Sequence, residues 1–177
     1  PTKAPTLKPT TPPITHVAIT DDILNRIESG FLTLVNEERA RVGCRPLTIN
    51  LYLDNYALIR SREIVTLFSH TRPDGSDCFS GINTNSYHYS SLGENIAQNH
   101  HLTTNYVTEE TKYFIGSDEQ ITNVYTNLFN AFKNSPGHYA NMISTSFDEC
   151  GIGITVKINE DINVPYFYLA HIFGAQQ

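Results

Sequence analysis

The hydrophobic pattern changes after Phe147 from a helical period to a strand period, and this change restricts the folds open to the chain. Four branched aliphatic residues alternate there with small or polar ones: Ile152, Ile154, Val156 and Ile158. Residues 164–173 then form a dense β-prone run that is apolar on both faces except at His171. Such a strand belongs inside a sheet that helices cover on both sides. We therefore expect two strands, joined by a hairpin around residues 159–163, with the second strand central.

Three amphipathic helices are expected before this change. They should cover about residues 21–42, 51–67 and 118–133. Asp21 or Asp22, Asn50 and Ser117 precede these helices as candidate caps, because their side chains can accept from free amide groups. A further helical turn is expected at residues 138–142. The order of elements predicts one α+β domain with three main helices and at least three strands.

The first twenty residues contain five prolines and six threonines, a composition that favours extended conformations and offers little to bury. We interpret residues 1–20 as a linker or stalk, in which Val17 to Ile19 begin to pack, and residues 21–177 as the domain. Stalks of this kind commonly precede domains displayed outside the cell, so we expect an extracellular location. We expect that Pro1 is not the native start and that the native chain has residues upstream of it.

Charge and hydropathy argue against a nucleic acid partner and against a transmembrane helix. The 177 residues carry a net charge of −6 that is dispersed along the chain, without a basic stripe. We therefore expect no nucleic acid partner. No apolar run approaches the roughly 20 residues that a transmembrane helix needs, so we expect no such segment.

Two histidines and a glutamate lie in turn-rich clusters. His70 belongs to FSHTRPDG, Glu94 to GENIA, and Ser135 and His138 to NSPGHYANM. Proline and glycine beside both histidines indicate chain reversals, where functional side chains tend to be displayed. Any one of these histidines could simply be a hydrogen-bonded structural residue. Together, the three clusters predict one ligand-binding site formed by His70, Glu94, Ser135 and His138.

The segments between these clusters give weaker patterns. Residues 75–91 indicate a long ordered loop, with a short helical turn at residues 78–82. Residues 91–97 should form a short strand or a bulged edge that carries Glu94. Residues 98–116 are polar and aperiodic, and we interpret them as an inserted surface loop whose adjacent histidines are exposed to solvent.

In this order the motifs resemble a known family. They are FSHTRPDG at 68–75, CF at 78–79, GENIA at 93–97, NSPGHYANM at 134–142, CGIGI at 150–154 and YLAHIFG at 168–174. The sequence from about Ile23 to Gly174 is similar to the bacterial branch of the CAP superfamily, named after cysteine-rich secretory proteins, antigen 5 and pathogenesis-related proteins and also called the SCP domain. The resemblance implies a secreted domain folded as a three-layer α/β/α sandwich with a mainly antiparallel sheet. It also implies a cleft with two histidines and acidic side chains.

Three residues match positions of the family motifs. His70 matches the first family histidine, Glu94 the glutamate of the GEN motif and His138 the histidine of the GH motif. Asn134 and Ser135 stand where the fuller eukaryotic pattern has a second glutamate, so any mechanism that needs two carboxylates lacks one here. Members have been connected with lipid or sterol binding, metal binding, proteolysis and toxin-like interactions, without a common reaction.

The three cysteines, Cys44, Cys78 and Cys150, cannot all pair within one chain. They are either one disulfide and one free thiol or three buried thiols. None has a CxxC or metal-ligand spacing, and none is assigned a catalytic role.

The residue types in the cleft favour zinc as a cofactor. Imidazole nitrogen suits zinc, or another divalent transition metal, better than it suits calcium or magnesium, so His70 and His138 are the expected ligands. Glu94 is expected nearby, either as a further ligand or as a hydrogen-bond acceptor behind the histidines. Neither a GxSxG nor an HExxH motif is present, so neither a serine hydrolase nor a metalloprotease of that type is indicated.

Three functions remain open. The first is a secreted or surface-displayed module whose His/Glu cleft binds a divalent metal, a small amphiphile or a peptide without turnover. The second is a protease-like hydrolase that uses His70, Glu94 and His138 with metal or water. The third is a cell-surface interaction domain, with a host or cell-surface protein as partner and a purely structural cleft.

Overall fold

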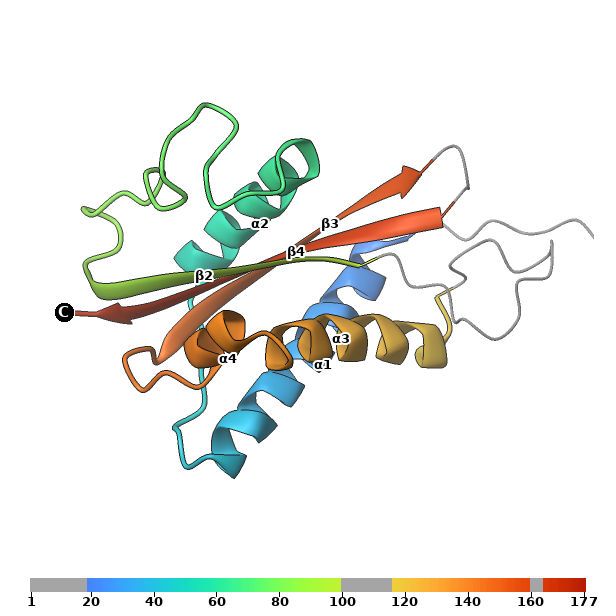
Figure 1. Ribbon diagram of the computed structural model, residues 1–177, viewed down its shortest axis with the longest axis horizontal. Coiled ribbons are helices and arrows are strands. Elements are labelled where there is room, and N and C mark those ends of the chain that lie inside the picture. Colours follow the sequence, from blue (N-terminus) through green and yellow to red (C-terminus); the bar gives the residue numbers. More distant parts are fainter. Residues whose placement is uncertain (1–18, 100–115, 160–163) are drawn as a thin grey trace, which may run out of the picture.

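The computed structural model describes residues 19–99, 116–159 and 164–177, which form a sheet with helices on both faces (Figure 1). The elements are α1 (Asp21–Arg41), β1 (Thr48–Ile49), α2 (Leu51–Thr66), β2 (Tyr89–Asn99), α3 (Asp118–Lys133), α4 (Pro136–Met142), β3 (Glu149–Asn159) and β4 (Val164–Gln176). Most of the expected linker, the inserted loop with His100 and His101, and the turn of the hairpin lie outside the described residues.

The sheet has the strand order β1-β3-β4-β2. Strand β4 pairs antiparallel with β3 on one side and with β2 on the other, so it is central, as predicted. The short strand β1, which the sequence analysis did not predict, pairs parallel with β3. Strand β2 begins earlier and ends later than the expected segment 91–97. Within the described residues, β2 is an edge strand.

Helix α2 covers one face of the sheet, and α1, α3 and α4 cover the other (Figure 1). Gly151 and Gly153 of β3 let α2 approach closely, since an added Cβ would lie 2.1 Å and 2.3 Å from its backbone, respectively. Phe31, Phe132 and Phe173 are fully buried in the core on the other face. The predicted α+β sandwich with a mainly antiparallel sheet is therefore confirmed.

Polar side chains cap the helices, with one difference from expectation. Thr20, not Asp21 or Asp22, caps α1, because its hydroxyl accepts from the amide of Ile23 at 3.4 Å while both aspartates lie inside the first turn. The cap of α2 at Asn50 and the capping box of α3 at Ser117 are confirmed.

The long loop and the cysteines can both be compared with expectation. Residues 78–82 form hydrogen-bonded turns without a regular helix. Cys44, Cys78 and Cys150 are all free thiols, which agrees with the second of the two alternatives and not with a disulfide. Cys78 and Cys150 are buried, whereas Cys44 is half-buried. No helix in the described ranges is long and apolar enough to cross a membrane.

Candidate functional site

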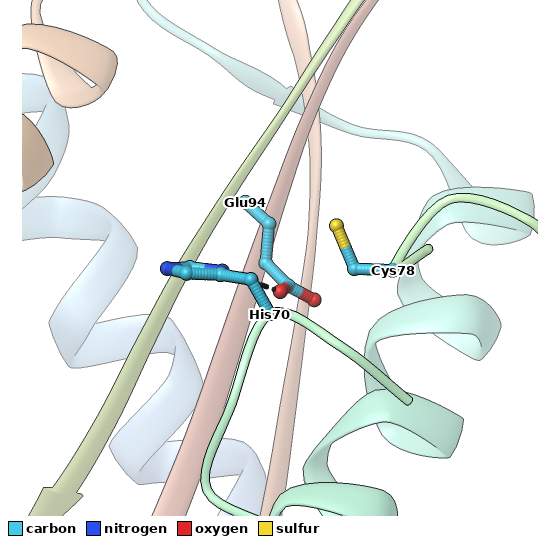
Figure 2. A group of neighbouring side chains, drawn as sticks. All are labelled: His70, Cys78 and Glu94. Carbon is cyan, nitrogen blue, oxygen red and sulfur yellow. Dashed lines mark hydrogen bonds and ion pairs between the residues drawn. The ribbon is translucent and has the colours of Figure 1, made fainter. Parts of the chain in front are cut away.

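His70 lies in the loop that follows α2, within contact distance of the sheet. Its Nδ1 is 2.8 Å from Oε1 of Glu94 on β2 (Figure 2). The Glu94 side chain is 1% exposed, whereas the His70 side chain is 55% exposed. Because a carboxylate only accepts, the hydrogen bond requires that Nδ1 carries the proton. In the neutral ring, Nε2 then keeps its lone pair.

Glu94 is held from the other side by Arg60 of α2, whose side chain is fully buried. Nε of Arg60 donates to Oε2 of Glu94 at 2.7 Å, and Nη2 donates to Oε1 at 3.2 Å. Both carboxylate oxygens are therefore occupied. A buried carboxylate needs such a partner, since removing one member of a buried ion pair leaves the other uncompensated.

The same guanidinium also fixes the backbone next to His70. Nη2 of Arg60 donates to the carbonyl of Ser69 at 2.9 Å, and Nη1 donates to Glu63 at 2.6 Å. Glu63 in turn accepts a hydrogen bond at 2.6 Å from Arg72, which lies two residues after His70 in the sequence. Burial lowers the pKa of Arg60, but its bonds to Glu94 and Glu63 outweigh this effect and raise the pKa overall. The arginine therefore stays charged.

Cys78 completes a compact group with His70 and Glu94 (Figure 2). One ligand atom from each of these residues lies within 4.8 Å of the other two. Burial, followed by the charge of Glu94, raises the pKa of the Cys78 thiol to about 12, so it is protonated at neutral pH. Cys78 was not predicted as a site residue, because its proximity to His70 and Glu94 depends on the path of the loop rather than on a spacing motif.

His138 lies on α4, in the opposite helix layer. Its ring packs against Phe132 with the centroids 5.0 Å apart. Burial and then the charge of His70 lower the pKa of His138, so its imidazole is neutral at neutral pH. His138 does not belong to the compact group around Glu94 in the described part of the chain, and the charge of His70 is only the second cause of its lowered pKa.

Strand β2 connects the two halves of this region. Glu94 faces α2, and its neighbour Asn95 faces α4, where its Nδ2 donates to the carbonyl of His138 at 2.9 Å. Asn141 of α4 donates to Oδ1 of Asn95, also at 2.9 Å. Adjacent residues of one edge strand therefore bind the segments that carry His70 and His138.

Ser135, the remaining predicted cleft residue, stands at the cap position of α4. It is half-buried, and its side chain makes no capping hydrogen bond. Its carbonyl accepts from the amide of Tyr139 at 2.8 Å, which starts the helix. The contacts of Ser135 are those of a helix start, and a role in the cleft stays a prediction.

The α/β/α sandwich and its edge strand β2, whose Glu94 and Asn95 bind the segments that carry His70 and His138, point to one class of protein. The family model described as "CAP: Cysteine-rich secretory protein family" matches residues 32–169, well over half of the sequence. The chain belongs to the CAP family. No curated protein matches the sequence significantly.

Solved structures of bacterial proteins share the fold. An outer surface protein from Borrelia burgdorferi has a TM-score of 0.56 and 17% identity, over 92% of this chain and 98% of that chain. An extracellular protein with an SCP domain from Bacillus anthracis has a TM-score of 0.60 and 18% identity, over 96% of this chain and 45% of that chain. A cysteine-rich secretory protein from Staphylococcus aureus has a TM-score of 0.51 and 18% identity, over 85% of this chain and 39% of that chain.

Proposed function

We propose that this chain is an extracellular or surface-displayed CAP domain whose His/Glu cleft binds a divalent transition metal, zinc, without turning over a substrate. The observation that carries this proposal is the 2.8 Å contact between Nδ1 of His70 and Glu94. Histidines that bind metals usually donate their other ring N–H to a carboxylate or carbonyl, which orients the ring and fixes the tautomer. His70 has this arrangement, with Nε2 as the metal-binding atom.

His138 is the second proposed ligand. Its lowered pKa keeps the imidazole neutral, which is the form that binds metal. Glu94 acts in this scheme as the acceptor behind His70 rather than as a ligand, because Arg60 hydrogen-bonds to both of its oxygens and compensates its charge. Two imidazoles suit zinc, while the hard ions calcium and magnesium prefer oxygen.

The His70–Cys78–Glu94 group is the alternative ligand set. Its donor types also suit zinc. Two features oppose it: the guanidinium of Arg60 contacts the carboxylate directly, and the Cys78 thiol would have to lose its proton. We therefore favour the pair of histidines.

A small amphiphile or a peptide is the second candidate ligand of the cleft. Leu67 and Phe68, just before His70, are 42% and 49% exposed. Exposed apolar side chains beside a polar group suit a ligand with both characters. The extracellular location is supported by the bacterial neighbours, which are described as outer-surface, extracellular or secretory proteins.

Calorimetric titration of zinc tests the proposal. We expect the wild type to bind zinc at neutral pH, and His70→Ala and His138→Ala each to weaken binding strongly. Cys78→Ser should bind as the wild type does. Binding should weaken as the pH falls through about 6.5, because protons compete for the imidazoles.

Three results would contradict the proposal or a part of it. The absence of zinc binding by the wild type would remove the metal function and favour a structural cleft. Loss of binding in Cys78→Ser but not in His138→Ala would assign the metal to the alternative ligand set. Zinc-dependent turnover of a peptide library would replace the binding module with the hydrolase.

A further inference from the structure

The guanidinium of Arg60 makes more hydrogen bonds around His70 than a single buried ion pair requires. Its guanidinium binds both oxygens of Glu94, one oxygen of Glu63 and the carbonyl of Ser69. Ser69 directly precedes His70, and Glu94 accepts from the His70 ring. One side chain thus fixes both the backbone beside His70 and the acceptor of its ring proton.

We infer that Arg60 is a positioning residue for the cleft, which sets the tautomer and the direction of His70 through Glu94. The effect of Arg60 on the His70 tautomer is inferred from the hydrogen bonds of Arg60. The effect on metal binding rests on the proposed function. Arg60 itself touches no ligand. It acts by holding a carboxylate oxygen in line with Nδ1 of His70.

The chemical consequence lies in the identity of the ring nitrogen that carries the proton. Which nitrogen of a histidine binds metal is set by the hydrogen bond that the other nitrogen makes. A fixed carboxylate at Nδ1 keeps the proton there and leaves the lone pair on Nε2. If Glu94 loses its orientation, the ring can carry the proton on Nε2, the atom that must be bare to bind metal. Loss of such an outer partner typically lowers metal affinity about 10–100-fold.

The chain offers a matched control for this role. Arg39 of α1 is also almost fully buried, and its guanidinium donates to carbonyls rather than to a carboxylate. Those acceptors belong to Arg45, Met142, Ser144 and Phe147. Arg39 therefore has the burial and the structural importance of Arg60 without its connection to His70.

The tautomer of His70 in the metal-free protein is the direct readout. Nitrogen-15 NMR of the imidazole distinguishes a proton on Nδ1 from one on Nε2, at a pH well above the ordinary histidine pKa of about 6.5. We expect the Nδ1–H form in the wild type and in Arg39→Met. Arg60→Met should shift His70 toward the Nε2–H form and weaken zinc binding about 10–100-fold.

Glu94→Gln gives a second test, which removes the negative charge but keeps the length and shape of the side chain. Nε of Arg60 contacts the Oε2 position at 2.7 Å, whereas Nη2 contacts the Oε1 position at 3.2 Å, so the shorter contact should draw the new carbonyl oxygen to the Oε2 position. The amide NH₂ would then face Nδ1 of His70, which must accept, so the ring should carry its proton on Nε2. The expected result is an inverted tautomer in a folded protein with weakened zinc binding.

The outcomes separate this inference from the proposed function. If folded Arg60→Met keeps the wild-type tautomer, or if Glu94→Gln keeps the proton on Nδ1, the positioning role of Arg60 is wrong. If Arg60→Met does not fold, Glu94→Gln alone decides. If the wild type binds no zinc, the proposed function fails, while the tautomer measurement still tests Arg60.

Discussion

Asn95 and His171 lie opposite each other on strands β2 and β4, yet of their two side chains only that of Asn95 has hydrogen-bond partners in the described part of the chain. The amide of Asn95 binds the carbonyl of His138 and the side chain of Asn141. Neither ring nitrogen of His171 has a hydrogen-bond partner within the described residues, and the ring packs against Phe31 and Phe173. Burial, followed by the charge of Arg39, lowers the pKa of His171 to about 3.

The first prediction concerns His171→Leu. The unfolded chain takes up a proton at His171 below about pH 6.5, and the folded chain does not until about pH 3. The wild type should therefore lose stability as the pH falls between these values. At about pH 4 this difference is worth roughly 3 kcal/mol, which the leucine variant should not lose. Denaturant unfolding at pH 7 and pH 4 measures it, and equal losses in both proteins would contradict the prediction.

The second prediction concerns Glu28 of α1, which lines a cavity of about 700 Å³ between α1, α2 and β3. Burial, then the charge of Asp54, raises the pKa of Glu28 to about 7. A raised pKa means that the stability contributed by the protonated group is lost as the pH rises from the ordinary value toward 7. Glu28→Gln should therefore stabilise the protein by roughly 1–2 kcal/mol above pH 7, after allowance for the partly exposed position.

Glutamine also keeps an acceptor for the amide of Ile154, which hydrogen-bonds to Glu28. Melting temperatures measured across pH test the prediction, with Glu37→Gln as an exposed control on the same helix. A gain in Glu28→Gln that is equally large at pH 4 would show that charge is not its cause.

The third prediction compares two glycines. An added Cβ at Gly153 would lie 2.3 Å from the backbone of Ala57, whereas one at Gly137 would meet nothing within 4 Å. Gly153→Ala should cost roughly 3 kcal/mol or more, because neither α2 nor the central part of the sheet can move easily. Gly137→Ala should change stability by no more than about 1 kcal/mol. Similar melting temperatures for the two variants would contradict the close packing of α2.

The fourth prediction concerns the linker. Deletion of residues 1–15 should change the free energy of unfolding by no more than about 0.5 kcal/mol, as expected of surface changes, because this segment has almost nothing apolar to bury. A differential scanning measurement of the shortened chain tests this. A large fall in melting temperature would mean that the segment docks on the domain.

Periodicity and caps predicted most of the regular structure. Helices α1, α2 and α3 begin and end close to their expected limits, because each combines an apolar stripe with a polar cap. The central position of β4 followed from its apolar character on both faces. Strand β1 was missed because two residues carry no period, and its pairing with β3 depends on the tertiary fold.

The site was predicted only in part. Neighbouring turn residues indicated His70, and the GENIA motif indicated Glu94. The structure places these two side chains in contact. Arg60 was missed, although it follows Tyr56 and precedes Ile64 at helical spacing on the buried face of α2. A basic residue on an apolar stripe indicates a buried acidic partner. That signal could have identified Arg60 but not Glu94 as its partner, because the sequence does not reveal which strand faces α2.

The arrangement of the helices on opposite faces has a consequence for the two segments that carry His70 and His138. The His70 segment is attached to the layer of α2, and His138 belongs to the layer of α3 and α4, with strand β2 between them. A packing change in one layer therefore shifts one histidine-bearing segment while the other keeps its hydrogen bond to β2. The span between the two segments is thus adjustable from either side without any change in the sheet.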